Sequence, residues 1–266
     1  MNTNTSNSKL RKERDIFLTA VMFFTRIPVP RNIGHGSDML QKSSRYFPWV
    51  GLLVGGINVL AFWLLHFIFP LQLTLVFAMI ISILTTGAFH EDGFADVCDA
   101  FGGGWTKEKI LVIMKDSRLG TYGVIGLIAM LGTKFLLLQE LAGHLPLQTF
   151  LFVLLAGHSS SRLAAVTLLQ QYAYVTDADQ SKSKPVADRK LNTTELIIAI
   201  IGGLLPFCFL PPLYLIALVL VIIARLYLGA YFYKWIGGQT GDCAGATQQV
   251  CEVALYIAVL ILTTFK

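Results

Sequence analysis

Charged residues are scarce in this chain: they make up only 14% of its 266 residues, whereas soluble domains carry about 25%. Hydrophobic residues make up 55%, and the mean hydropathy is +0.63. So little charge beside so much apolar surface excludes an ordinary soluble domain. The composition instead predicts an all-α, polytopic integral membrane protein, with the lipid bilayer as its surroundings.

The chain also lacks the short motifs of several enzyme classes. We find no Walker sequence, no glycine-rich kinase loop and no nucleophile elbow. The four cysteines form no CxxC pair and no spacing typical of a secreted domain, so we expect no disulfides. The net charge of +5 is concentrated in polar segments beside the apolar runs, and it indicates no nucleic-acid partner.

Long apolar runs dominate the rest of the chain. A membrane-spanning helix needs about 20 mostly apolar residues, and we expect about seven such helices: 48–69, 71–89, 121–142, 147–169, 194–210, 212–232 and 248–265. The apolar stretch 16–24 is too short to cross and predicts a short interfacial or re-entrant helix. Residues 1–14 are expected to form a disordered tail, which leaves 15–266 as a single membrane-embedded catalytic domain.

The distribution of basic residues predicts the orientation. Lysine and arginine accumulate in the cytoplasmic loops of membrane proteins. Of the 21 in this chain, 17 lie in residues 1–47, 90–120, 170–193 and 233–247. We therefore expect a multi-pass protein of the cytoplasmic (inner) membrane, with its N-terminus and its active-site loops in the cytoplasm.

The most informative segment is HEDGFADVCD, residues 90–99. On a helix, Asp96 and Asp99 lie within about 40° of Asp92, so the three carboxylates share one face. Clustered carboxylates repel one another unless a cation offsets their charge. The pattern predicts a site for a hard metal ion such as Mg²⁺; the alternative is a solvated acidic helix end.

Two further polar segments contain glycines and potential anion ligands. KDSRLGTYG, residues 115–123, offers Lys115, Ser117 and Arg118 to phosphate oxygens, or else is a basic anchor followed by a turn. GGQTGDCAGAT begins at residue 237, and its Asp242 could cap a helix or bind metal. Packing of small residues explains part of this segment, but not its polar members: Gln239, Thr240 and Asp242.

Other candidates are weaker. His90 lies roughly 160° from Asp92 around a helix, so it could be a ligand only if the helix began after it. Glu91 is an additional ligand or merely faces water. Arg26 is a juxtamembrane anchor or a substrate contact, and Arg162 belongs to a polar stripe that could line a cavity. We expect Lys134 to reach towards the end of its helix with Glu140.

Carboxylates beside anion-friendly glycine segments favour phosphoryl-group chemistry, since Mg²⁺ commonly bridges carboxylates and substrate phosphates. A transporter should instead show inverted repeats and acidic residues near the membrane midplane, and neither is apparent. A non-catalytic membrane scaffold would tolerate alanine at the three aspartates.

The order of four motifs carries a family resemblance: TRIPVP, HEDGFAD followed by Asp99, KDSRLGTYG and GGQTGDCAGA. From about residue 15 to 255 the chain closely resembles bacterial cobalamin synthases, the adenosylcobinamide-GDP ribazoletransferases. The resemblance implies a Mg²⁺-dependent membrane enzyme of the last stage of vitamin B12 assembly. It implies that adenosylcobinamide-GDP is joined to α-ribazole, or to its 5′-phosphate, with release of GMP.

On this reading we expect four aspartates to be catalytic and to hold one or two Mg²⁺ ions: Asp92, Asp96, Asp99 and Asp242. The expected substrate-binding residues are His90, Glu91, Lys115, Ser117, Arg118, Gln239, Thr240, Gly241, Arg26 and Arg162. Other enzymes of the cobalamin pathway are possible partners, and an oligomer is compatible with the sequence.

The aspartate motif also distantly resembles that of CDP-alcohol phosphotransferases, which act on phospholipid precursors. In this chain no arginine follows Ala95, and Asp99 comes three residues after Asp96 rather than four. This departure argues against a phospholipid headgroup transferase, although the type of displacement is shared.

Overall fold

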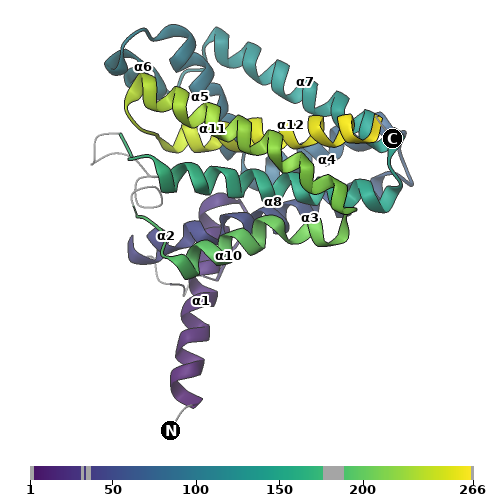
Figure 1. Cartoon of the computed structure of the whole chain (residues 1–266), viewed down its shortest axis with the longest axis horizontal. Helices are drawn as coiled ribbons and strands as arrows, with labels where there is room; N and C mark the ends of the chain where they lie inside the picture. Colours follow the sequence, from purple (N-terminus) through teal and green to yellow (C-terminus); the bar gives the residue numbers. More distant parts are fainter. Residues whose placement is uncertain (1–2, 31–32, 34–36, 176–188, 265–266) are drawn as a thin grey trace.

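The computed structural model describes residues 3–30, 33, 37–175 and 189–264, and the elements it shows there are helices (Figure 1). They are α1 (Thr3–Phe24), α2 (Ser37–Ser43), η1 (Ser44–Tyr46), α3 (Phe47–Leu65), α4 (Leu71–Thr86), α5 (Phe89–Gly103), α6 (Lys107–Met114), α7 (Thr121–His144), α8 (Leu147–Gln171), α10 (Thr193–Leu204), η2 (Leu205–Phe209), η3 (Pro212–Ile216), α11 (Ala217–Ile236) and α12 (Gly241–Thr264). The prediction of an all-α, polytopic membrane protein is confirmed.

The number of spans differs from the expected seven. Within the described residues, five helical stretches are long and apolar enough to cross a membrane: Asp38–Leu65, Thr121–His144, Leu147–Gln171, Pro212–Ile236 and Gly241–Thr264. A sixth is reached if α4 and α5, which meet at 88°, count as one broken span. The 16 residues of α4 rise only about 24 Å, less than the hydrocarbon core of roughly 30 Å. The expected span 194–210 is a shorter apolar helix, Thr193–Phe209.

The N-terminus also differs from expectation. Helix α1 begins at Thr3 and runs for 22 residues, so the expected disordered tail and short interfacial helix are one continuous helix. Lysine, arginine, leucine and glutamate between residues 9 and 14 are good helix formers, which explains the continuity. The first turns of α1 project away from the bundle (Figure 1), whereas Ile16, Ala20 and Phe24 are buried near its end.

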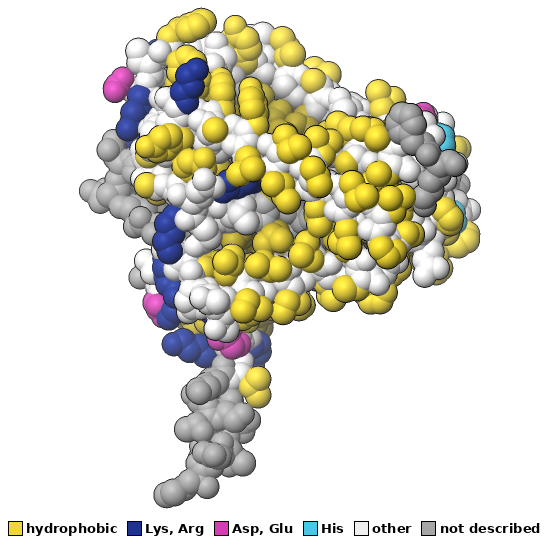
Figure 2. Space-filling model, viewed as in Figure 1, with side chains coloured by type: hydrophobic (Ala, Val, Ile, Leu, Met, Phe, Trp, Pro, Cys, Tyr) yellow, Lys and Arg dark blue, Asp and Glu magenta, His cyan; other side chains and the backbone are white. Residues whose placement is uncertain are grey.

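Helices α8 and α12 form the centre of the bundle. In each, 72% of the most apolar stretch is buried, against 17% in α7 and 28% in the stretch that contains α11. Hydrophobic side chains cover much of the outer face, while lysines and arginines gather at the end that carries α6 and the N-terminal helices (Figure 2). This separation is typical of a bundle whose apolar belt faces lipid.

A buried carboxylate, Glu252 of α12, joins the central helices. It accepts hydrogen bonds from Gln248 Nε2 at 2.8 Å and Tyr256 OH at 3.0 Å, and it pairs with Lys134 Nζ of α7 at 2.6 Å. The expectation that Lys134 reaches towards the helix end with Glu140 is therefore wrong. A lysine inside a membrane protein is costly unless it is paired, and the acid on α12 provides that pairing.

The pair predicts a stability test. Breaking it by Lys134→Met should lower the free energy of unfolding by about 3–5 kcal/mol, because Glu252 would remain buried and charged. The double variant Lys134→Met/Glu252→Gln should recover much of this loss. Thermal unfolding in detergent measures both, with Lys109→Met, an exposed change on α6, as control. Equal stability of the single variant and the wild type would contradict the role of the pair.

Candidate active site at the α5–α12 contact

The acidic helix leaves the end of α4 at a sharp corner. Gly87 and Ala88 both have left-handed backbones, with φ of 66° and 59°, which turns α5 away from α4 by 88°. This conformation costs an alanine roughly 1 kcal/mol. The Arg26 side chain lies against Gly87 where a Cβ would be, and its backbone N–H donates to Thr85 O at 2.8 Å. The TRIPVP segment therefore packs on the corner that aims the acidic helix.

Helices α5 and α12 approach closely enough for their backbones to touch. A Cβ added to Gly93 would lie 3.0 Å from Asp242 Cα and 3.2 Å from its carbonyl oxygen. One added to Gly245 would lie 3.4 Å from His90 O. Small residues permit such approach between membrane helices. The contact brings Asp242, which lies 150 residues after Asp92 in the sequence, against the acidic helix.

The four predicted aspartates meet at this contact. Asp96 interacts electrostatically with Asp242, Asp92 and Asp99, and Asp242 also interacts with Asp92. Asp92 is exposed and the other three are partly buried. Among the described residues, no lysine or arginine forms an ion pair with any of the four. Within the described residues, the negative charge of the site is therefore not neutralised by an ion pair.

The aspartate cluster fits a divalent cation shared with a substrate better than a closed metal cage. Carboxylate oxygens are the ligands that Mg²⁺ prefers. In the described part of the chain, however, no three His, Cys, Asp or Glu side chains converge closely enough to hold an ion by themselves. Magnesium sites commonly use one or two carboxylates together with substrate phosphates, and this arrangement fits that pattern.

The Asp99 carboxylate is bound by backbone amides at the start of α7. Its Oδ2 accepts a hydrogen bond from Gly120 N at 2.7 Å, and its Oδ1 accepts one from Gly123 N at 2.9 Å. A Cβ on either glycine would collide with the carboxylate. Both oxygens thus cap the first turn of α7, where amides lack partners within the helix. The backbone amides of Gly120 and Gly123, in KDSRLGTYG, thus bind a carboxylate of the protein itself.

The expected phosphate donors of that segment lie on the protein surface. Arg118 is exposed and forms an ion pair with Asp116, with Nη2 at 2.6 Å from Oδ2. The hydrogen bonds that Arg118 donates lower the pKa of the Asp116 carboxyl to about 2. Lys115 and Ser117 are exposed as well. Exposed side chains are compatible with a basic anchor and with phosphate binding, so phosphate binding by these three residues stays a prediction.

The glycine-rich segment before α12 is held by its backbone. Gln239 N donates to Ala173 O at 2.9 Å, and Val175 N donates to Gln239 O at 3.0 Å. Thr240, rather than Asp242, caps α12, because its hydroxyl accepts from Cys243 N at 3.2 Å. Gly241 is the first residue of the helix.

The Gln239 side chain is fully buried, and its Oε1 and Nε2 both lack hydrogen-bond partners among the described residues. Buried amides are normally satisfied, since an unpaired polar group costs about 1–3 kcal/mol. Gln239 is therefore the predicted substrate residue that has the clearest unused binding capacity.

His90 and Arg162 face the interior instead. Helix α5 begins at Phe89, so the condition for His90 to be a ligand is not met. Its ring is buried and stacks on Phe47, with the centroids 5.5 Å apart. Arg162 is also buried and donates to His158 O at 2.8 Å. The structure shows neither side chain at the aspartates.

Glu91 reveals residues that the sequence did not single out as part of the site. Its Oε1 accepts a hydrogen bond from Gln249 Nε2 at 3.0 Å. The same Nε2 donates to Gln248 Oε1 at 2.9 Å, and Gln248 donates to Glu252. A polar chain thus connects the acidic helix with the buried Glu252–Lys134 pair. Its signals in the sequence were Glu252, a charged residue within a predicted span, and Gln249, which follows Asp242 by seven residues and so shares its helix face.

Comparison with known proteins agrees with this geometry. The model of the cobalamin-5-phosphate synthase family matches residues 16–260. The chain belongs to this family. It is 46% identical over 254 residues to the adenosylcobinamide-GDP ribazoletransferase of Shewanella frigidimarina, covering 95% of this chain and 96% of that protein. The enzyme of the same name from Shewanella oneidensis is 44% identical over 252 residues, with 94% and 95% covered.

The predicted family resemblance is thereby confirmed, and the CDP-alcohol phosphotransferase alternative is not favoured. No solved structure matches the chain. The four motifs on which the resemblance rests lie around three contacts of α5 in this family member: the α4–α5 corner, the α5–α12 crossing and the contact of Asp99 with the start of α7.

Because the aspartates have different surroundings, we expect their replacement by alanine to affect stability differently. Asp99→Ala removes the cap of α7 and should lower stability by about 1 kcal/mol. Asp92→Ala removes an exposed carboxylate from among like charges and should leave the melting temperature unchanged or higher. Thermal unfolding without added metal separates the two. A melting temperature that falls only for Asp92→Ala would contradict this division.

Proposed function

We propose that this chain joins adenosylcobinamide-GDP to α-ribazole, or to its 5′-phosphate, and releases GMP in the final assembly of cobalamin. The observation that carries the proposal is the meeting of Asp92, Asp96 and Asp242 at the α5–α12 contact, in a chain that matches ribazoletransferases over about 95% of its length. An acidic, metal-ready site suits the displacement of a nucleotide from a diphosphate.

Asp92, Asp96 and Asp242 are the residues that would hold Mg²⁺. When bound, the ion would neutralise the diphosphate and the phosphate that departs with GMP. Asp99 is left out of this set because both of its oxygens already bind backbone amides.

The chain's own groups would orient the substrates. The Gln239 side-chain amide, which has no hydrogen-bond partner among the described residues, and the N-terminal turn of α12, which begins at Gly241, would offer N–H donors to phosphate oxygens. Arg26 is exposed at the corner before the acidic helix and would contribute a cation from the other side. These three groups lie on the segments that flank the aspartates.

Asp96 is the proposed general base. The other candidates from the sequence are occupied elsewhere: Asp99 caps α7, and His90 stacks on Phe47 inside the bundle. Asp96 would accept the proton from the ribose hydroxyl of α-ribazole as that oxygen bonds to the phosphorus on the corrinoid side. The bond to the GMP oxygen breaks in the same displacement.

We infer that this end of the bundle faces the cytoplasm. Lysines and arginines gather there (Figure 2), and cytoplasmic segments of membrane proteins are enriched in these residues. The proposal places the chain in the inner membrane, where soluble nucleotide-activated substrates would reach the aspartates from the cytoplasmic side. An oligomer and contacts with other cobalamin-pathway enzymes stay predictions.

Release of GMP from adenosylcobinamide-GDP and α-ribazole by the purified protein tests the proposal. We expect turnover that requires Mg²⁺ and that falls at least about 100-fold in Asp92→Asn and in Asp242→Asn, a loss of several kcal/mol of transition-state stabilisation. Asp38→Asn, at an acid paired with Lys42 outside the cluster, is the matched control.

Wild-type turnover in both aspartate variants would refute the assigned site. Release of CMP from a CDP-activated lipid, without release of GMP from the corrinoid substrate, would refute the assigned reaction.

A further inference from the structure

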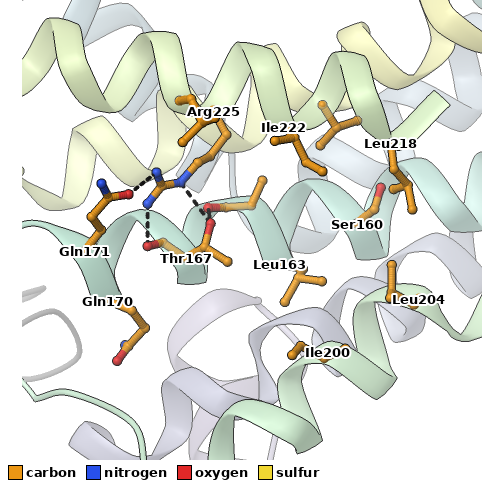
Figure 3. A pocket seen from close by; sticks show the side chains of 13 residues that line it. Ser160, Leu163, Thr167, Gln170, Gln171, Ile200, Leu204, Leu218, Ile222 and Arg225 are labelled. Atoms are coloured by element: carbon orange, nitrogen blue, oxygen red, sulfur yellow. Dashed lines mark hydrogen bonds between the residues drawn. The ribbon is translucent and has the colours of Figure 1, made fainter. Parts of the chain in front are cut away.

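A cavity of about 690 Å³ lies between α8, α10 and α11, away from the aspartates (Figure 3). Most of its lining is apolar, and Ile200, Ile222 and Leu226 on its rim are 39%, 55% and 50% exposed. These side chains belong to helices that present apolar surface to the membrane. The cavity is therefore a groove that opens towards lipid.

One end of the groove is polar and positively charged. Arg225 of α11 points to Thr167 and Gln171 of α8 (Figure 3), donating from Nε to Thr167 Oγ1 at 2.9 Å, from Nη2 to Thr167 O at 2.6 Å, and from Nη1 to Gln171 Oε1. Within the described residues, no carboxylate pairs with Arg225. Arg225 is only 6% exposed, and a charge buried within a membrane-spanning bundle without a counter-ion is costly.

Further cations surround the same end. Lys190 Nζ donates to Leu169 O at 3.0 Å and also to Gln170 O, at the C-terminus of α8. Nearby, Arg45 and Arg189 both bind Glu195 at the start of α10, at 2.8 and 3.0 Å. Arg45 also binds Glu13 at 2.8 Å, so two carboxylates balance these two arginines. Lys190 and Arg225 have no carboxylate partner among the described residues. These two cations complement an anion rather than a zwitterion.

The groove continues from Arg225 into a mostly apolar half, in which Ser160 is the polar lining residue (Figure 3). Leu218 of α11 and Leu204 of α10 line the far end (Figure 3), and the seven residues from Leu218 to Arg225 rise about 10 Å along the helix. A ligand that fills the groove thus has an anionic head at one end and an apolar chain of at least that length.

We propose that the groove binds one anionic phospholipid of the surrounding bilayer, with its phosphate at Arg225 and an acyl chain between α10 and α11. The lipid supplies the counter-charge that the described residues do not. It also braces α11 against α8, and α11 leads directly into the segment that carries Gln239 and Asp242. This inference does not depend on the proposed reaction.

Native mass spectrometry of the purified protein in neutral detergent tests the proposal. The protein is mixed with equal amounts of phosphatidylglycerol and phosphatidylcholine of identical acyl chains. We expect one retained phosphatidylglycerol, and a preference over phosphatidylcholine that falls about tenfold in Arg225→Gln. Arg225→Lys should keep part of the preference. Lys234→Gln, an exposed cation on the same helix, should keep all of it.

A second variant tests the groove without touching the arginine. Ile222→Trp places an indole over the groove and should abolish lipid retention, while the melting temperature in detergent alone stays near that of the wild type. Equal retention of both lipids, or an unchanged preference in Arg225→Gln, would overturn the proposal. An equal rise in melting temperature with inorganic phosphate and with phosphatidylglycerol would also overturn it. So would an Ile222→Trp protein that retains its lipid but no longer dimerises, because the groove would then be a contact between two copies of the chain.

Discussion

The close contact of α5 with α12 is the constraint on which the rest of the structure depends. Gly93 lies against the backbone of Asp242, and this contact makes one acidic site from residues far apart in the sequence. Like charges resist such an arrangement, so packing elsewhere must hold the helices together. The chain of hydrogen bonds from Glu91 through Gln249 and Gln248 to Glu252 lies beneath the contact. Lys134 neutralises its deepest member.

The aspartates of one motif have separate physical tasks. Asp92 is exposed and forms no ion pair with the described residues, which suits an ion and a diphosphate arriving from water, whereas Asp99 accepts hydrogen bonds from the amides of Gly120 and Gly123. Asp99 thereby fixes α7 against α5, and α7 carries Lys134. The cap and the buried ion pair thus both anchor α7 to the helices of the site. The proposed lipid in the groove between α8, α10 and α11 would steady α11 in the same framework.

Much of this could be predicted from the sequence, because composition and motif order are local information. Scarce charge predicted the helical membrane bundle, and four ordered motifs predicted the family. The corner at Ala88 could not be predicted, since nothing in the sequence marks an alanine that adopts φ of 59°. Nor could the partner of Lys134, which lies 118 residues away on α12. Spacing also places Asp99 beside Asp92 without revealing that the α7 amides bind it.

The most direct test of the central claim compares valine at two glycines within helices. Gly93→Val drives side-chain atoms into the Asp242 backbone, whereas Gly132→Val, on α7, meets no atom within 4 Å of its Cβ and has the same intrinsic cost in a helix. Release of GMP by the two purified, folded proteins is the measurement. The account predicts near-complete loss for Gly93→Val and retention for Gly132→Val. Full activity of Gly93→Val would contradict it.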